Sequence, residues 1–353
     1  MQIPFTTTFS KIPNTYIKTS QSVDIIENFS YDDPSESVYK ITGVRGSGKT
    51  VLLAKIEEEF NSKEREKEGW TVCSLTVNRD MLMQLAALLN KKGLLKEKTK
   101  NKGASVSANV LGTGATVGVS ASKGDDFFDV GIELDEALKN MTEKGKKLLI
   151  GVDEVSKTKE MVIFAAEFGK WLREGYSVYL VCTGLYDNIE QLANVKNLTF
   201  FRRATTVKTE PLNTIRMAEA YKQQLGVEPE EARKLAGVTK GYAYAFQELG
   251  ILYFKNGKKT SFDNICSDLK TELFAYAYEK IWEELSEEDR GLARLLTDAE
   301  DNKRENIMAR MDKPKNYSVY RDRLIKRGIV NARQAYISLA LPFFAEYIKE
   351  YGI

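Results

Sequence analysis

Short apolar runs recur through the first 210 residues, and stretches with helical spacing separate them. We predict strands at five of these runs, residues 37–42, 70–77, 147–152, 176–182 and 198–207. Continuous apolar runs of this length are typical of strands that are buried on both faces. Strands that alternate with helices favour a parallel sheet covered by helices on both sides. The pattern therefore predicts an α/β fold with a three-layer αβα core.

The pattern changes after residue 210, where helical spacing dominates. Apolar positions three and four residues apart predict helices at 214–225, 229–235 and 242–255, then at 287–296, 304–311 and 317–327, and alternation at 329–341 predicts a β-hairpin. The later succession of helix, helix, turn, helix and hairpin is the order of a winged helix. In its third helix, Tyr320 and Leu324 are four residues apart and should share a buried face. We predict a core at 1–210, a helical lid at 211–282 and a winged helix at 283–353.

Composition supports several domains in one chain and excludes some chemistry. The sequence has 353 residues, more than one hydrophobic core ordinarily supports. Its net charge of +2 gives no global electrostatic argument for a nucleic-acid partner. The chain contains no histidine, which excludes histidine bases and histidine metal ligands. The widely spaced Cys73, Cys182 and Cys266 favour free thiols in a reducing compartment.

Nothing in the sequence indicates a membrane. The first 13 residues lack the apolar segment of a signal peptide, and no apolar run approaches the roughly 20 residues that a helix needs to span a bilayer. We therefore expect a soluble, cytoplasmic protein.

The first candidate site is the segment GVRGSGKT at 43–50, which lies between the first predicted strand and a helical stretch. It is a complete Walker A motif, whose glycines let backbone N–H groups face phosphate oxygens at a helix N-terminus. Lys49 would neutralise the β- and γ-phosphates of ATP, and Thr50 would ligate Mg²⁺. The predicted nucleotide-binding residues are Gly43, Val44, Arg45, Gly46, Ser47, Gly48, Lys49, Thr50 and Val51.

A second motif supplies carboxylates. The predicted strand at 147–152 is followed by Asp153 and Glu154, and we expect this strand to neighbour the Walker A strand. Asp153 would hold Mg²⁺ through water, and Glu154 would orient the attacking water. Thr183 follows the strand at 176–182, at an edge where ligands bind in open α/β sheets. Its hydroxyl either contacts the γ-phosphate or the attacking water, or simply begins a turn before Gly184. The two motifs together predict a magnesium-dependent ATPase.

This order of motifs resembles the AAA+ superfamily and its STAND relatives, above all bacterial ATPases allied with the archaeal origin-recognition group. The resemblance extends from residues 4–13 to the turn at 240–243. It implies that an arginine near the end of the last core strand, Arg202 or Arg203, acts on the γ-phosphate of a neighbouring subunit. Origin-recognition proteins usually carry a lid arginine in a Gly-Asp-Ala-Arg pattern. This chain instead has Gly241-Tyr242-Ala243-Tyr244, a departure that is closer to STAND proteins and argues against rapid, lid-coupled hydrolysis.

Residues 96–126 interrupt the composition of the core. A lysine-rich start is followed by small residues that alternate around the turn at 111–114, a pattern typical of a β-hairpin. Three interpretations stay open: a disordered loop, a hairpin that contacts a partner or DNA, and a packed structural hairpin.

The third helix of the predicted winged helix is basic, and we expect its cations to project outward where a recognition helix would meet phosphate. The candidate DNA contacts are Lys313, Lys315, Arg321, Arg323, Lys326 and Arg327. A basic surface does not by itself identify its ligand. Two functions are favoured: an ATPase whose nucleotide state controls DNA contact by the winged helix, and a slow signalling or defence switch that acts through a protein partner or homo-oligomer without DNA. A third is a nucleotide-binding scaffold that hardly hydrolyses ATP, although the intact Asp153–Glu154 pair argues against it.

Overall fold

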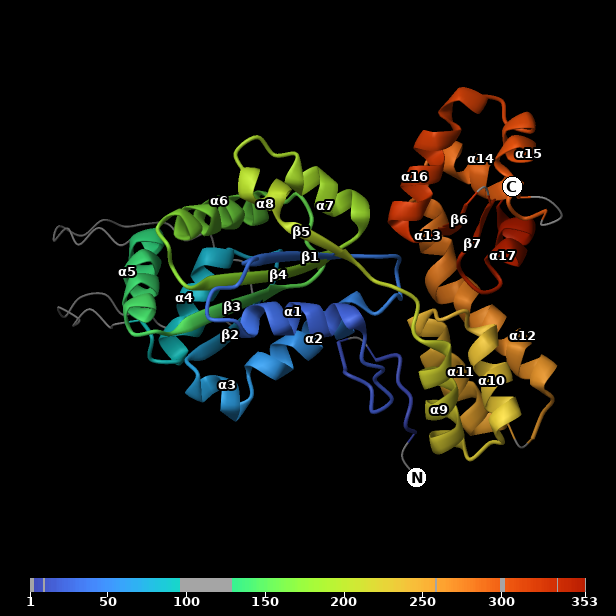
Figure 1. The fold of residues 1–353 in the computed structure, drawn as a ribbon, viewed down its shortest axis with the longest axis horizontal. Coiled ribbons are helices and arrows are strands. Elements are labelled where there is room, and N and C mark those ends of the chain that lie inside the picture. The colour runs from blue at the N-terminus through green and yellow to red at the C-terminus, as the bar shows by residue number, and fades with distance from the viewer. Residues whose placement is uncertain are drawn as a thin grey trace, which may run out of the picture.

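The computed structural model describes residues 3–8, 10–95, 129–257, 259–298, 302–334 and 336–352. Figure 1 shows an α/β core (residues 20–208) with two smaller lobes beside it, a helical lobe (214–283) and a C-terminal lobe (287–351). The hairpin predicted within residues 96–126 lies outside the described residues.

A parallel sheet forms the centre of the core. Its strands are β1 (Val38–Thr42), β2 (Trp70–Leu75), β3 (Lys147–Val152), β4 (Val178–Gly184) and β5 (Thr205–Lys208). The strand order is β2-β3-β4-β1-β5 and every pairing is parallel, so all carboxyl ends lie at one edge. The expectation that the Asp153 strand neighbours the Walker A strand is wrong, because β4 lies between β3 and β1.

Helices cover both faces of the sheet (Figure 1). One face packs against α1 (Ser20–Ser30) and α2 (Lys49–Phe60), with α3 (Lys63–Lys67) beside β2. The other face packs against α4 (Met81–Lys91), α5 (Val130–Glu143), α6 (Lys159–Arg173), α7 (Tyr186–Ala193) and α8 (Thr199–Arg203). Each face has its own hydrophobic cluster. The predicted αβα core is confirmed.

The strand predicted at 198–207 is wrong in its first half. Residues 199–203 form the short helix α8, and only Thr205–Lys208 pairs with β1. Leu198 and Phe201 are three residues apart and both are buried under the neighbouring helices. That spacing matches a helical turn rather than the alternation of a strand, so burial of this apolar pair decided the local structure.

The helical lobe contains α9 (Thr214–Leu225), α10 (Pro229–Val238), α11 (Ala243–Asn256) and α12 (Phe262–Leu273), which continues through the π-helical turn η1 (Phe274–Tyr278) into α13 (Glu279–Glu283). The N-terminal segment joins this lobe. Phe5 packs against the rings of Tyr221 and Phe246, and the Thr6 N–H donates to Gln247 Oε1 at 3.0 Å. The first residues therefore bridge the core and the helical lobe.

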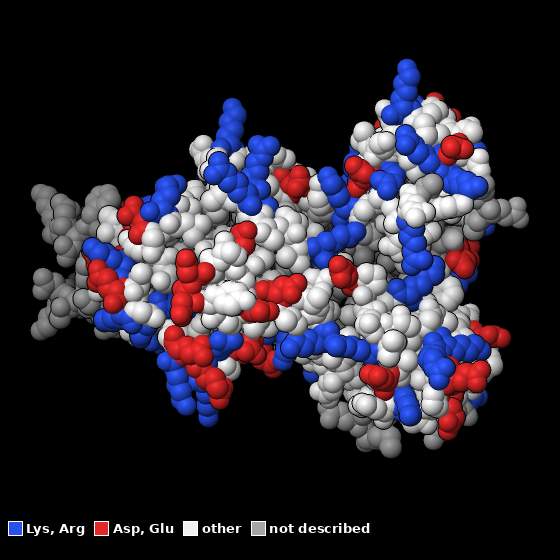
Figure 2. Space-filling view, viewed as in Figure 1, with Lys and Arg blue, Asp and Glu red and all other residues white. Residues whose placement is uncertain are grey.

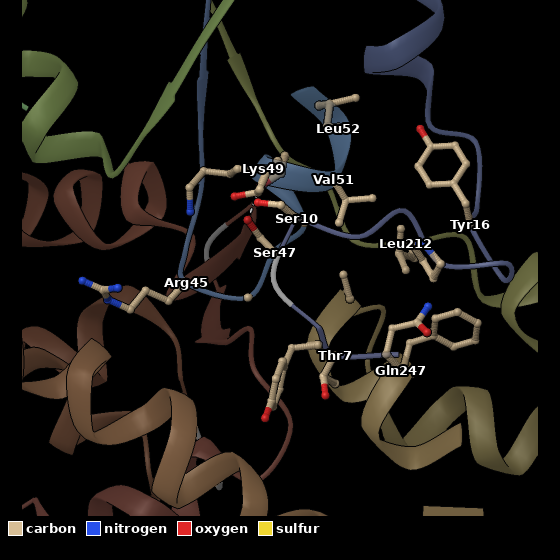
Figure 3. A pocket seen from close by; sticks show the side chains of 18 of the residues that line it. Thr7, Ser10, Tyr16, Arg45, Ser47, Lys49, Val51, Leu52, Leu212 and Gln247 are labelled. Atoms are coloured by element: carbon tan, nitrogen blue, oxygen red, sulfur yellow. Dashed lines mark hydrogen bonds between the residues drawn. The ribbon is translucent and has the colours of Figure 1, made fainter. Parts of the chain in front are cut away.

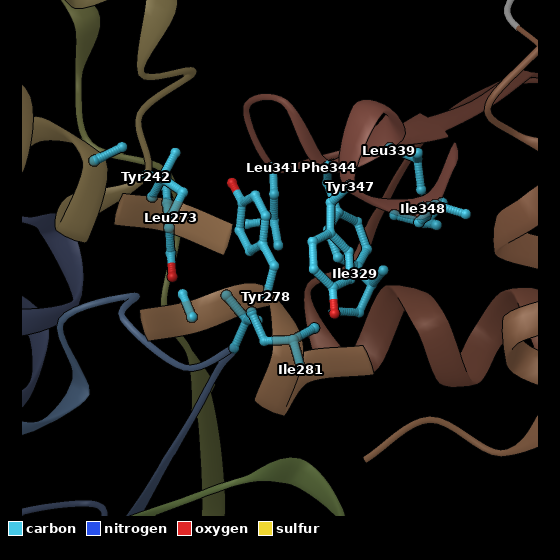
Figure 4. Close-up of a cluster of buried hydrophobic side chains, with 14 of the residues drawn as sticks. Tyr242, Leu273, Tyr278, Ile281, Ile329, Leu339, Leu341, Phe344, Tyr347 and Ile348 are labelled. Atoms are coloured by element: carbon cyan, nitrogen blue, oxygen red, sulfur yellow. The ribbon is translucent and has the colours of Figure 1, made fainter. Parts of the chain in front are cut away.

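The C-terminal lobe contains α14 (Glu287–Leu295), α15 (Arg304–Ala309), η2 (Pro314–Asn316), α16 (Tyr317–Arg327), the antiparallel hairpin of β6 (Val330–Arg333) and β7 (Tyr336–Leu339), and α17 (Phe344–Tyr351). This is the element order expected of a winged helix. Tyr320 and Leu324 are buried as predicted. Figure 4 shows Tyr278 beside Phe344 and Tyr347, so one hydrophobic core runs from the helical lobe into the C-terminal lobe.

Candidate active site

The Walker A segment forms a tight loop between β1 and α2. Gly46 and Gly48 have φ angles of 71° and 91°, in the left-handed region that favours glycine. Gly43 is required by crowding, since a Cβ there would lie 2.0 Å from Thr209 Oγ1. The Thr209 hydroxyl also donates to Ser47 Oγ at 2.8 Å. Thr209, which sequence reasoning missed, therefore fixes the loop from the end of β5.

Lys49 begins α2 and points back into the loop. Its Nζ donates to the carbonyl oxygens of Gly43 and Val44, each at 3.0 Å. Burial lowers the pKa of Lys49 to about 8, and the nearby Asp153 carboxylate opposes this shift. The ammonium group thus lies partly desolvated beside the loop, where an anion would restore its preference for the charged form.

The side chain of Asp153, which follows β3, contacts both α2 and β4. Its Oδ1 accepts a hydrogen bond from Thr50 Oγ1 at 3.2 Å and another from the Thr183 hydroxyl. Thr183 is completely buried at the end of β4. Although β4 separates β3 from β1, the shared carboxyl edge still brings Thr50, Asp153 and Thr183 together.

Glu154 is exposed and has a φ of 54°, which is uncommon for a residue with a side chain. Its N–H lies 3.2 Å from Thr183 Oγ1 and 3.1 Å from Asp153 Oδ1. This backbone geometry gives Glu154 a place in the wall of the cavity beside the loop. A strained backbone that is fixed by its neighbours is a feature of functional sites.

A cavity of about 470 Å³ extends from the Walker A loop toward the N-terminal segment and α11. In Figure 3, Lys49, Ser47 and Arg45 come from the loop, whereas Tyr16 and Gln247 lie across the cavity. The Tyr16 hydroxyl is buried and has no hydrogen-bond partner among the described residues. The volume is within the range of small-molecule sites. The cavity therefore joins the loop to a second region that can hold the rest of a ligand.

Comparisons with known proteins support this architecture. A family model described as "Domain of unknown function (DUF8462)" matches residues 275–348. No similar sequence was found among curated proteins. Among solved structures, the Walker-type ATPase of Pyrococcus abyssi has 14% identity and a TM-score of 0.62, with 95% of this chain and 96% of that chain covered. The Aeropyrum pernix ORC2 protein, in its ADPNP-ADP complexes, has 15% identity and a TM-score of 0.55, with 94% and 92% covered.

The chain has the fold of the AAA+ P-loop ATPases. The resemblance to ATPases of the origin-recognition type is thus confirmed at the level of the fold. No helix in the described part of the chain has the length and hydrophobicity of a membrane-spanning segment.

Within this AAA+ fold, Arg202 and Arg203 lie on α8 rather than at the end of a strand. Both are exposed, and they precede β5, whose first residues pair with the start of β1. The Walker A loop follows the opposite end of β1. The two arginines are therefore not brought to the loop of their own chain.

The helical lobe contacts the loop through the turn in which the sequence lacks an arginine. The Tyr242 hydroxyl donates to the Arg45 carbonyl at 2.6 Å, and the Tyr244 N–H donates to the Gly46 carbonyl at 3.0 Å. Burial raises the pKa of Tyr242 and raises that of Tyr244 to about 12, so both phenols stay protonated near neutral pH. Sequence reasoning identified the missing arginine but missed these contacts, which no local pattern could reveal.

The basic helix α16 is arranged differently from the prediction. Arg323 and Arg327 were expected to project outward, but both contact the carboxylate of Asp289, which is completely buried; each ion pair measures 2.7 Å. Arg327 also pairs with Asp187 of α7 at 2.7 Å, and Lys326 lies over the ring of Tyr186. The outward placement is therefore wrong for Arg323 and Arg327, because a buried carboxylate needs paired cations.

The remaining basic candidates are accessible. Lys313 and Lys315 are exposed, and Arg321 is half-buried beside Asp322. These accessible basic side chains of the C-terminal lobe lie on η2 and the first turns of α16, away from the contact of α16 with α7.

Proposed function

We propose that this protein binds ATP with Mg²⁺ and hydrolyses it. The observation that carries the proposal is the convergence of the Thr50 and Thr183 hydroxyls on Asp153, next to Lys49 and the Walker A loop. These residues come from α2, from the position after β3 and from β4. Lys49 and Thr50 line the cavity together with Glu154, the neighbour of Asp153. The unpartnered Tyr16 hydroxyl supports a ligand that extends to the far end of the cavity, since a buried hydroxyl without a partner is costly.

The donor set fits magnesium. Mg²⁺ usually binds through one or two protein oxygens, with phosphate and water completing its shell, and it compensates phosphate charge. Thr50 and Asp153 would supply those protein oxygens. Lys49 would neutralise the β- and γ-phosphates, and the Gly46 and Gly48 region would present backbone N–H groups. Glu154, exposed in the cavity wall, would orient the attacking water, and Thr183 would hold Asp153 in place or contact the γ-phosphate.

We further propose that nucleotide state reaches the C-terminal lobe through contacts with the core. Lys208, at the end of β5, donates to the carbonyl of Ile325, and a Cβ on Gly328 would lie 3.5 Å from the Val44 N. The end of α16 therefore lies against the Walker A loop. Residues 1–210 would act as the ATPase domain, 211–282 as its lid and 283–353 as a winged helix.

A second candidate function is contact with duplex DNA by the exposed cations Lys313 and Lys315, together with Arg321. Figure 2 shows Lys and Arg side chains on both sides of the boundary between the core and the C-terminal lobe. In this arrangement the last turn of α16 contacts the core and is covered by it. DNA contact would therefore use η2 and the start of α16, or would follow release of the lobe; a protein partner on the same surface is the alternative.

Arg202 and Arg203 can contribute to hydrolysis only in another copy of the chain, because they lie at the opposite edge of the sheet from their own loop. A homo-oligomer that places α8 of one copy at the cavity of the next would give either arginine access to the γ-phosphate.

The deciding experiment measures ATP turnover with Mg²⁺, with and without duplex DNA, at low and moderate salt. Glu154→Gln should retain ATP binding and lose at least about a hundredfold in turnover, the size of effect seen when one transition-state contact is removed. Unchanged turnover would remove Glu154 from catalysis. DNA stimulation that fades with salt would support phosphate contacts by the C-terminal lobe. Turnover indifferent to DNA would favour a switch that acts on protein partners.

A further inference from the structure

The Walker A loop is held by residues of the helical lobe. Tyr242 precedes α11 and is buried behind the loop, where its hydroxyl donates to the Arg45 carbonyl at 2.6 Å. Tyr244, in the first turn of α11, donates its N–H to the Gly46 carbonyl at 3.0 Å. Two consecutive carbonyl groups of the loop are thus directed toward the lobe.

The geometry of the Arg45–Gly46 peptide links the contact with Tyr242 to phosphate binding. In a trans peptide the C=O and N–H point in opposite directions, and every described peptide bond is trans. The Arg45 carbonyl points to Tyr242, so the N–H of Gly46 in the same peptide points away from it. Gly46 lines the cavity. Among the described residues, this N–H donates to no protein acceptor.

Crowding around Gly46 shows how closely the lobe fits the loop. A Cβ built on Gly46 would lie 2.3 Å from Tyr242 Oη and 2.9 Å from Tyr244 Cβ. The glycine is therefore needed both for its left-handed backbone and for the approach of the tyrosine. Rotation of the Arg45–Gly46 peptide would break the hydrogen bond to Tyr242 and leave a buried phenol without a partner, which is costly.

We propose that Tyr242 is a positioning residue of the nucleotide site. Its hydroxyl fixes the Arg45–Gly46 peptide so that the Gly46 N–H is already directed at a phosphate oxygen before the nucleotide binds. This inference rests on the proposed binding of ATP. Donors fixed in advance lower the ordering cost of binding, so Tyr242 strengthens phosphate binding without touching the nucleotide.

The side chain of Arg45 is held as well, near the junction of the two lobes. The guanidinium of Arg45 donates from Nε to Glu284 Oε1 at 2.7 Å, just after α13. The carbonyl of Arg45 is thus held by the helical lobe, and its side chain is held near residue 283. Since binding free energies are reciprocal, a lobe that positions the loop is itself held more firmly when phosphate is bound.

The test compares Tyr242→Phe with Tyr221→Phe. Tyr221 is a matched control because its buried hydroxyl also donates to a backbone carbonyl, that of Phe246 at 2.7 Å, within the same lobe and away from the loop. Affinity for Mg-ATP and for Mg-ADP would be measured by calorimetric titration, at a temperature at which circular dichroism shows both variants folded.

Tyr242→Phe should weaken nucleotide affinity about tenfold, a loss of about 1.4 kcal/mol, and should raise KM while kcat changes less than about threefold. Tyr221→Phe should change affinity less than twofold with a similar loss of thermal stability. Equal affinities in the two variants would overturn the positioning role. If the wild-type chain bound no nucleotide at all, the proposed function itself would fail. If Tyr242→Phe did not fold, Gly46→Ala, which crowds the same hydroxyl, would replace it and should also weaken affinity by at least tenfold.

Discussion

Charged residues are used in opposite ways at the two ends of this molecule. In the core, Lys49 is partly desolvated beside an open cavity, and within the described part of the chain its ammonium donates hydrogen bonds only to loop carbonyls. In the C-terminal lobe, Arg323 and Arg327 are neutralised by the buried carboxylate of Asp289. The first arrangement leaves a charge free for a ligand, whereas the second uses charge to hold a helix in place. A positive residue is therefore a candidate ligand contact only when the fold leaves it without an acidic partner.

The largest expected effect follows from removing the charge in the core. Lys49→Ala should abolish ATP binding in a calorimetric titration, because Arg45, the other cation of the loop, is paired with Glu284. Lys55→Ala, on the same helix α2 but paired with Glu58 on the surface, should bind ATP as the wild type does. Retained binding by Lys49→Ala would mean that the cavity holds nucleotide in another orientation or not through its phosphates.

Removing the carboxylate in the C-terminal lobe should lower stability instead. Asp289→Asn leaves two arginines without their buried partner, and breaking such a pair costs about 3 kcal/mol in the free energy of unfolding, measured by urea titration. Asp322→Asn breaks only the exposed pair with Arg321 and should cost less than about 0.5 kcal/mol. If both variants were equally stable, Asp289 would not organise the lobe.

The depressed pKa of Lys49 predicts how binding depends on pH. A lysine with a pKa of about 8 loses its proton between pH 7 and 9, and the neutral amine attracts phosphate less. Because the charged form is the one that binds, apparent ATP affinity should follow the fraction of Lys49 that is still protonated. That fraction, and with it the affinity, should fall about tenfold from pH 7 to pH 9. Fluorescence titration with a labelled ATP at several pH values measures this. Constant affinity over that range would contradict the depressed pKa.

The smallest effect concerns the basic surface. Replacing both Lys313 and Lys315 by alanine should weaken duplex DNA binding several-fold and make it less dependent on salt, by a slope change of about 1–2. Arg323→Ala should change DNA affinity less than twofold, because its guanidinium is engaged with Asp289. Filter binding at three salt concentrations separates the two. A larger loss for Arg323→Ala would show that α16 turns the cations paired with Asp289 toward DNA.

The candidate site was predictable as a set of motifs but not as a geometry. The sequence predicted three of its parts because a few neighbouring residues define each of them: the Walker A loop, Asp153 and the strand that precedes Thr183. Their assembly was not, since β4 separates β3 from β1 and the hydroxyl of Thr183 completes the contact with Asp153. The parts of the fold with long, regular spacing were also predictable, including α9, α16 and the terminal hairpin. The segment that became α8 was not, because its aromatic residues fit either a strand or a helical turn until their packing partners are known.

The sequence by itself determined the elements whose cause is local. Glycines at 43, 46 and 48 set the loop, apolar runs set the strands, and Tyr320 and Leu324 set the buried face of α16. Tertiary structure decided every property that depends on a distant partner. Tyr242 reaches Arg45 across about 200 residues of sequence, and Asp289 turns Arg323 and Arg327 inward from a helix more than 30 residues away. The physical reason is that a side chain's direction follows from which charges and hydroxyl groups must be satisfied after burial, and burial is a property of the whole fold.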